Sequence, residues 1–182
     1  MSKVVKFGGS SLASAEQFRK VGDIIRGDSG RRYVVPSAPG KRFPKDTKVT
    51  DMLYACYDLA EAEEDFGEEL KAIAERFQEI IDGLGIDISL EEEFSMIRTN
   101  FTQKSGSNYA ASRGEYLNGI IMAAYLGYEF IDAAQVIFFD KEGNFDAEKT
   151  EKVLSARLAE CQCAVIPGFY GAMPDGRVKT FS

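Results

Sequence analysis

Residues that can bind an anion cluster near the start of the chain, in the segment Lys6–Ser11, which reads KFGGSS. The backbone N–H groups of Gly8 and Gly9 can approach an oxyanion closely, and a helix that begins soon after them adds partial positive charge. Lys6 contributes a full positive charge at the end of a short β-branched strand, and Ser10 contributes a hydroxyl. The segment predicts a phosphate-binding loop, although an ordinary strand-to-helix turn would explain the same residues.

The more familiar phosphate-binding and catalytic motifs are absent from the sequence. No G-x-x-x-x-G-K-[ST] segment occurs, and no G-x-G-x-x-G segment follows a predicted strand. The chain has no histidine, which excludes Ser-His-Asp triads, histidine-based zinc sites and the catalytic loop of protein kinases. Cys161-x-Cys163 has no second cysteine pair, so no metal site is predicted. An enzyme built from these residues should catalyse a reaction that needs no strong base.

The elements that must position these residues follow from the hydrophobic periodicity. Helices are predicted over 14–26, 50–64, 68–84, 89–103, 108–126 and 146–160, and strands over 3–7, 32–35, 130–132, 136–139 and 163–167. Ser14, Thr50, Ser89 and Asp146 are expected to cap their helices. Helices that alternate with strands predict a mainly parallel sheet covered on both faces. The loop 36–41 then lies at the carboxyl edge of the sheet, where open α/β sheets bind ligands.

Composition limits the classes of protein that the sequence can encode. The chain has 182 residues, of which 45% are hydrophobic and 28% charged, as expected of one globular domain. The formal net charge of −7 lacks the basic character of nucleic-acid-binding proteins and disfavours contact with an anionic membrane surface. No apolar run is long enough to span a membrane, and no signal peptide is recognised, so a cytoplasmic location is expected.

Four separated segments occur in a fixed order along essentially the whole chain, namely Lys6–Ser11, Val34–Ala38, Ser112–Glu115 and Val165–Gly171. Together they resemble the N-terminal part of the catalytic domain of aspartate kinases, which belong to the amino-acid kinase family. The resemblance implies a three-layer α/β/α sandwich around a mainly parallel sheet. It also implies ATP-dependent phosphorylation of the β-carboxylate of L-aspartate to 4-phospho-L-aspartate, the first step of lysine, threonine and methionine biosynthesis. ATP and Mg²⁺ would be the cofactors, and the full-length enzyme would be a homo-oligomer.

The resemblance also implies roles for the residues of the first segment. Lys6 would bridge the phosphoryl group during its transfer, and Gly8, Gly9 and Ser10 would donate hydrogen bonds to it. An aspartate carboxylate is already ionised at neutral pH, so the reaction needs positioning and charge neutralisation instead of a base. A chain without histidine fits this chemistry.

Three further residues are expected to bind the amino-acid substrate. Glu115 would hold the α-amino group through a charge-assisted contact, and Gly114 would leave space for the ligand. Ser37 and Thr50 would supply hydroxyl contacts. The plainer readings are an exposed helix glutamate for Glu115, a loop cap for Ser37 and a helix N-cap for Thr50.

The chain ends at Ser182 within the expected second arm of a β-hairpin, whose turn is Pro174-Asp175-Gly176. The resemblance implies that residues 1–182 are the N-terminal portion of a catalytic domain, with the ATP-site half and ACT regulatory domains lying beyond them. We therefore expect the isolated chain to be inactive. Two alternatives stay open: another amino-acid kinase of the same fold, such as a glutamate 5-kinase, and a folded fragment without catalytic activity. The Ser-Arg-Gly-Glu segment favours an aspartate kinase.

Overall fold

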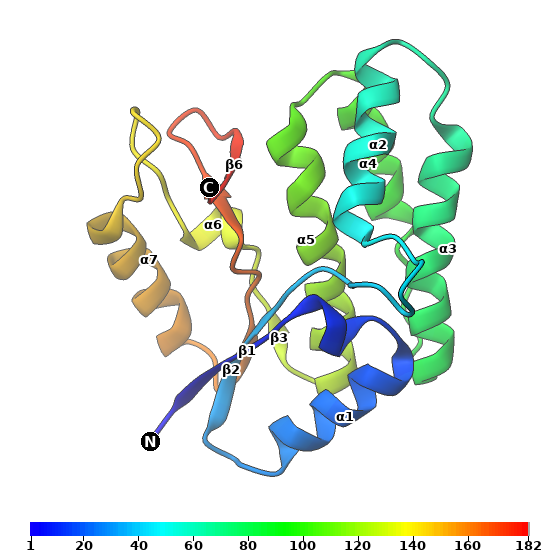
Figure 1. The fold of residues 1–182 in the computed structure, drawn as a ribbon. Coiled ribbons are helices and arrows are strands. Elements are labelled where there is room, and N and C mark those ends of the chain that lie inside the picture. Colours follow the sequence, from blue (N-terminus) through cyan, green and yellow to red (C-terminus); the bar gives the residue numbers. More distant parts are fainter. Residues whose placement is uncertain (182) are drawn as a thin grey trace.

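A four-stranded sheet forms the centre of the computed structural model, which describes residues 1–181 (Figure 1). Its strands lie in the order β1-β2-β4-β3, and each strand is parallel to its neighbours. The strands are β1 (Lys3–Phe7), β2 (Arg31–Pro36), β3 (Glu129–Phe130) and β4 (Ala164–Val165). The prediction of a mainly parallel sheet is confirmed.

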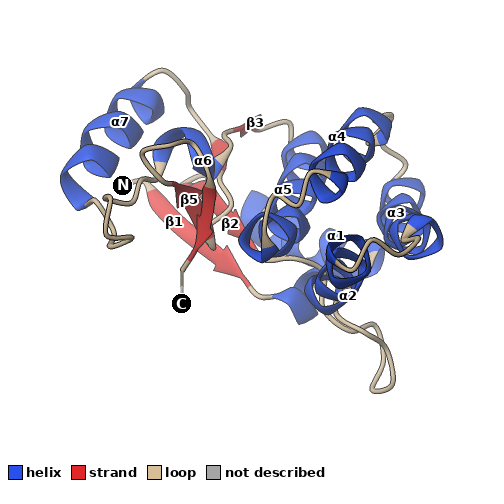
Figure 2. Ribbon diagram, turned by 90° about the horizontal axis from the view of Figure 1, so that it is seen from above, coloured by secondary structure: helices blue, strands red, loops and turns tan. Residues whose placement is uncertain are grey.

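Helices cover both faces of this sheet (Figure 2). One face carries α1 (Ala15–Arg26), α2 (Val49–Glu61), α3 (Gly67–Leu84), α4 (Glu91–Thr102) and α5 (Ser107–Leu126). The other face carries α6 (Ala133–Val136) and α7 (Ala147–Ala159). A short 3-10 helix, η1 (Gly9–Leu12), connects β1 to α1, and β5 (Tyr170–Ala172) pairs antiparallel with β6 (Val178–Thr180). The predicted three-layer arrangement and the hairpin are both confirmed.

Alternate residues of the central strands serve the two opposite layers. Val34 of β2 and Val165 of β4 belong to the larger hydrophobic cluster, whose other members come mainly from α1 to α5. Ala164 of β4 belongs to the smaller cluster, against which Tyr33 of β2 and residues of α7 pack. Because successive side chains of a strand point to opposite faces, each central strand contributes to both cores.

Helix α5 runs between the sheet and the helices α2, α3 and α4 (Figure 1). Even its polar residues Ser112 and Asn118 have no exposed surface, because other elements surround this helix on several sides. Within residues 1–181, no helix combines the length and the apolar character that crossing a membrane requires. Helix α5 is buried because it lies at the centre of the protein. Its Ser-Arg-Gly-Glu segment is therefore in the protein interior.

Two of the four predicted helix caps are present as expected. The Ser14 hydroxyl accepts a hydrogen bond from the backbone N–H of Gln17, and the Asp146 carboxylate accepts one from Lys149. Gly85 ends α3 in the left-handed conformation with a φ of 65°, which a residue without a side chain adopts at little cost.

The other two capping predictions were wrong. Lys48 is the N-cap of α2 and Thr50 lies inside its first turn, because Val49 is fully buried and its N–H donates to the carbonyl of Pro39. Leu90 is the N-cap of α4. The hydroxyl of Ser89 still accepts a hydrogen bond from Glu91, but from one position before the N-cap.

The strand predicted over 136–139 was also wrong. Asp132 caps the short helix α6 by accepting a hydrogen bond from Ala134, and this helix includes Val136. Phe138 and Phe139 make only isolated β-bridges, to Ala172 and Phe145. The β-branched and aromatic composition that suggested a strand reflects burial, because periodicity cannot separate a short buried strand from a short buried helix.

Candidate active site

A cavity of about 530 Å³ opens at the carboxyl edge of the parallel sheet. It is bounded by the segments that follow β1, β2 and β4, together with the start of α2 and the middle of α5. Its lining residues are Gly9, Ser10, Ser37, Ala38, Pro39, Gly40, Lys41, Lys48, Thr50, Glu115 and Phe169. The structure therefore brings together five of the residues that the sequence singled out: Gly9, Ser10, Ser37, Thr50 and Glu115.

Glu115 is the one carboxylate among these lining residues, and it is only 8% exposed. Its Oε2 accepts hydrogen bonds from the backbone N–H groups of Gly168 (3.1 Å) and Phe169 (3.0 Å). Burial raises the pKa of Glu115, while these two N–H groups and the positive charge of Lys6 oppose the rise. The alternative reading of an exposed helix glutamate is wrong, because α5 is buried.

The glycine next to Glu115 has a different use from the one expected. A Cβ on Gly114 would lie 2.8 Å from the Cβ of Ala38 and 3.3 Å from a methyl carbon of Leu53. The missing side chain therefore allows α5 to pack against the loop after β2 and against α2, and it does not make room for a ligand. By allowing this contact, Gly114 places Glu115 beside the loop that forms the cavity wall.

The glycine loop Gly8–Ser10 lies directly against the loop after β2. The N–H of Gly40 donates to the carbonyl of Gly9 at 2.8 Å, and a Cβ on Gly9 would lie 2.7 Å from the carbonyl oxygen of Ala38. Glycine at position 9 is thus required by the close approach of two backbones. Gly8 has open space around it, with no heavy atom within 4 Å of the position that a Cβ would occupy.

The two hydroxyl residues reach the cavity from different elements. Ser37 follows β2, where its N–H donates to the carbonyl of Phe7 and its own carbonyl accepts from the side chain of Asn118. Thr50 lies in the first turn of α2. Within residues 1–181 neither hydroxyl has a hydrogen-bond partner, so both are free to contact a ligand.

Lys6 and Gly8 lie beside the cavity and are not among its lining residues. Lys6 pairs with Val35 in the register of β1 and β2, and its side chain is exposed. Its positive charge is one of the influences that oppose the rise in the pKa of Glu115. Lys6 therefore lies near the cavity, on the strand that leads into the glycine loop.

Sequence reasoning missed several lining residues. Lys41 and Lys48 lie at the two ends of a basic segment that the sequence shows plainly, yet no motif connected them to the site. Phe169 lines the cavity and donates its backbone N–H to Glu115, a contact that a sequence pattern does not reveal. The signal that could have found the two lysines is their position after β2, on the edge of the sheet where ligands bind.

The donors of this cavity fit an anionic ligand that also carries a positively charged group. Backbone N–H groups, two lysines and hydroxyls suit a phosphate or a carboxylate, and the buried carboxylate of Glu115 suits an ammonium. A protein-bound Mg²⁺ fits poorly, because Glu115 is the only lining carboxylate and one of its oxygens is already used. Within residues 1–181 no group of three or more metal-ligating side chains is present.

Comparison with known proteins shows which family the chain is similar to. The sequence profile described as the amino acid kinase family matches residues 1–181. Aspartokinase 3 of Bacillus subtilis is 37% identical over 194 aligned residues, which cover 99% of this chain and 43% of that protein. The chain thus spans less than half the length of this relative.

Solved structures agree with the sequence comparison. The aspartate kinase of Clostridium acetobutylicum is 50% identical and superposes with a TM-score of 0.95, over 98% of this chain and 41% of that one. Aspartokinase III of E. coli, solved in complex with aspartate and ADP, is 22% identical with a TM-score of 0.79, over 99% of this chain and 43% of that one. At that identity, the E. coli structure supports the fold alone.

Proposed function

The chain belongs to the amino acid kinase family, and on that premise we propose that it forms the aspartate-binding part of an aspartate kinase. The reaction would transfer the γ-phosphoryl group of ATP to the β-carboxylate of L-aspartate. Similarity to aspartate kinases of B. subtilis and C. acetobutylicum supports this assignment within the family. The Ser-Arg-Gly-Glu segment at residues 112–115 favours this assignment over a glutamate 5-kinase.

Glu115 is the observation that carries the proposal. Two backbone N–H groups hold one oxygen of a buried carboxylate whose pKa is raised by burial, and no cation is in direct contact with it within residues 1–181. An ammonium group entering the cavity would supply the missing positive charge. The α-amino group of aspartate has that chemistry, and charge-assisted hydrogen bonds are among the strongest in proteins.

The remaining residues would position the two carboxylates of aspartate and the incoming phosphoryl group. Ser37 and Thr50 would donate hydroxyl hydrogen bonds to the substrate, and Gly8, Gly9 and Ser10 would receive the phosphoryl oxygens. Lys6 would neutralise the charge that these oxygens carry during transfer, which is the main task of the protein in phosphoryl transfer. Mg²⁺, which we expect to arrive bound to ATP, would neutralise the charge of the nucleotide phosphates.

We propose that the chain is part of a longer protein. The chain spans 43% of B. subtilis aspartokinase 3, so we propose that residues 1–182 are the N-terminal portion of a catalytic domain, with the nucleotide site and ACT regulatory domains elsewhere in the full-length protein. A cytoplasmic location and a homo-oligomeric state stay predictions from the sequence.

A coupled assay of ADP release tests this function. With Mg-ATP, the full-length protein should turn over L-aspartate and not L-glutamate, whereas the purified 182-residue chain should show essentially no turnover. Correct placement of two reactants lowers a barrier by roughly 7–11 kcal/mol, and a site without its nucleotide half cannot place both. Preference for glutamate would overturn the substrate assignment, and full activity of the isolated chain would overturn the placement of the nucleotide site.

A further inference from the structure

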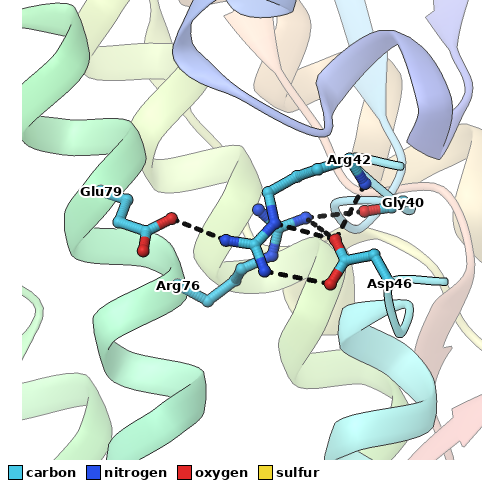
Figure 3. Close-up of polar contacts among 5 residues, drawn as sticks. All are labelled: Gly40, Arg42, Asp46, Arg76 and Glu79. Carbon is cyan, nitrogen blue, oxygen red and sulfur yellow. Dashed lines mark hydrogen bonds and ion pairs between the residues drawn. The ribbon is translucent and has the colours of Figure 1, made fainter. Parts of the chain in front are cut away.

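Four charged side chains form a network behind the cavity wall, and none of them lines the cavity (Figure 3). Arg42 holds the Asp46 carboxylate through Nε (2.8 Å to Oδ2) and Nη2 (3.0 Å to Oδ1). Arg76 of α3 approaches the same carboxylate, with its Nη2 3.3 Å from Oδ2. Glu79 joins from the outside through a contact of 2.8 Å with Nη1 of Arg42.

Arg76 connects this network to the glycine loop. Its Nη2 donates a hydrogen bond of 2.8 Å to the carbonyl of Gly40, and the N–H of Gly40 in turn donates to the carbonyl of Gly9 at 2.8 Å. A single residue, Gly40, therefore links a helix outside the site to the loop predicted to bind phosphate. Fixing the Gly9 carbonyl also fixes the direction of the Ser10 N–H, because both belong to one planar peptide.

The contact between the two glycines leaves little freedom for either backbone. A Cβ on Gly40 would lie 2.6 Å from the carbonyl carbon of Gly9 and 2.8 Å from the backbone nitrogen of Ser10. Surfaces packed this closely move together, because a gap between them would lose contacts and an overlap is excluded. A shift of Gly40 would therefore be transmitted to Gly9 and Ser10.

Stability alone does not explain an arginine at position 76. The side chain is only 3% exposed, and its Nε has no hydrogen-bond partner within residues 1–181. Burying a charge with an unpaired donor costs free energy, and apolar residues of similar size often replace buried ion pairs without loss of stability. A role in which Arg76 holds Asp46 and Gly40 in place would explain why a residue with this cost is present.

We propose that Arg76 is a positioning residue for the glycine loop Gly8–Ser10. Asp46, held by Arg42, orients the Arg76 guanidinium, which fixes Gly40, and Gly40 fixes Gly9 and Ser10 in the geometry that receives the phosphoryl group. The importance for phosphoryl transfer rests on the proposed function, whereas the placement of the loop rests on the contacts of Arg76 and Gly40 alone.

Two measurements on Arg76→Met test the proposal. In the full-length protein we expect kcat to fall about 10- to 100-fold with the KM for aspartate nearly unchanged, because a misplaced loop affects the transferring group more than the bound substrate. Hydrogen exchange should show the Gly40 amide losing protection while the temperature of unfolding stays close to that of the wild type. Arg76→Lys retains a nitrogen able to make both contacts and should recover most of the lost kcat.

Two control variants separate positioning from general damage. Arg26→Met removes another arginine that donates to a backbone carbonyl, that of Tyr125, at the end of α1 away from the cavity. Glu75→Gln removes a mostly exposed carboxylate of α3 that lies outside the network. Both should leave kcat and the protection of Gly40 unchanged.

The outcomes distinguish a positioning role of Arg76 from a purely structural one. Unchanged protection of Gly40 in Arg76→Met overturns the proposal, and so does lost protection with a normal kcat. If the wild-type protein shows no aspartate-dependent turnover, the proposed function fails, but the exchange of Gly40 still decides whether Arg76 holds the loop. A refolding defect in Arg76→Met that Arg76→Lys shares would mean that Arg76 is structural, and the proposal would fail.

Discussion

Asp46 and Glu115 are two carboxylates that have little contact with solvent and opposite electrostatics. Glu115 is buried inside the protein, and Asp46 lies nearer the surface with its side chain largely covered by its arginine partners. Hydrogen bonds from Arg42 lower the pKa of Asp46 well below its usual range, whereas burial raises the pKa of Glu115. The difference lies in the partners: guanidinium groups donate hydrogen bonds to Asp46, whereas within residues 1–181 the hydrogen-bond donors to Glu115 are neutral backbone N–H groups.

This difference separates a structural carboxylate from a binding one. A buried charge that is already neutralised holds its surroundings in place, as Asp46 holds the segment between β2 and α2. A buried charge that is only partly neutralised is kept ready for a ligand of opposite charge, and such perturbed groups gather at functional sites.

Replacement of Lys6 should have the largest effect on the reaction. In the full-length protein, Lys6→Ala should lower kcat by on the order of a hundredfold or more and should change the KM for aspartate far less. The lysine is expected to stabilise charge that develops only in the transition state, which affects kcat. Steady-state kinetics decide this, and a nearly normal kcat would remove Lys6 from the mechanism.

Replacement of Glu115 should affect the binding of aspartate. We expect Glu115→Gln in the full-length protein to weaken aspartate about 10- to 100-fold while ATP binding is unchanged, because a charge-assisted hydrogen bond contributes about 1.5–3 kcal/mol. Titration calorimetry with each ligand separately measures both affinities. Asp46→Asn also replaces a carboxylate by an amide, but outside the cavity, so it should leave the affinity for aspartate nearly unchanged. Equal weakening of both ligands in Glu115→Gln would contradict the assigned role.

Replacement of Asp46 should affect the stability of the fold. Asp46→Asn removes the acceptor shared by Arg42 and Arg76 and leaves the Arg76 charge buried without its partner. We expect a loss of about 2 kcal/mol in the free energy of unfolding, reduced from the full cost of a broken buried pair because Arg42 is partly exposed. Urea denaturation of the 182-residue chain measures it, and an unchanged midpoint would show that the network contributes little to stability.

The residues around the cavity were easier to predict from the sequence than their contacts. Gly9 and Ser10 were singled out from their types and order, because strand, glycine loop and helix form a local pattern, and both line the cavity. The placement of Thr50 within α2 depended on Val49 and Pro39, a contact between two segments that periodicity does not show. For the same reason, no sequence pattern indicated that Gly9 packs against the loop after β2.

The buried network behind the cavity could not be predicted from the sequence, because it depends on contacts between distant segments. Arg42, Asp46 and Arg76 come from a loop and a distant helix, and charged residues at such positions are usually exposed. Only the packing of α3 against the segment between β2 and α2 shows that Arg76 is buried. Long-range packing thus decides which charged residues acquire a role, while local patterns decide where helices and strands form.

The smallest expected effect is a difference between Glu115 and Asp46 in how each changes the free energy of unfolding with pH. Because the pKa of Glu115 is raised in the folded chain above its ordinary 4.5, the folded state holds this proton more tightly than the unfolded state. Ionisation of Glu115 therefore lowers stability as pH rises from about 4.5 to the raised pKa. Glu115→Gln removes this cost, so its stability relative to the wild type should increase across that range and then stay constant.

Asp46 should behave in the opposite way. Its pKa is lowered from 3.8, so its stabilising effect is complete above that value and is lost only as pH falls below it. Denaturation of the wild type, Glu115→Gln and Asp46→Asn between pH 3 and pH 8 compares the two effects directly. A ligand with an ammonium group should also cancel the gain from Glu115→Gln, because it neutralises the wild-type carboxylate. If Glu115→Gln instead destabilised the chain increasingly as pH rose, the ionised Glu115 would already be fully satisfied, and the distinction between the two carboxylates would collapse.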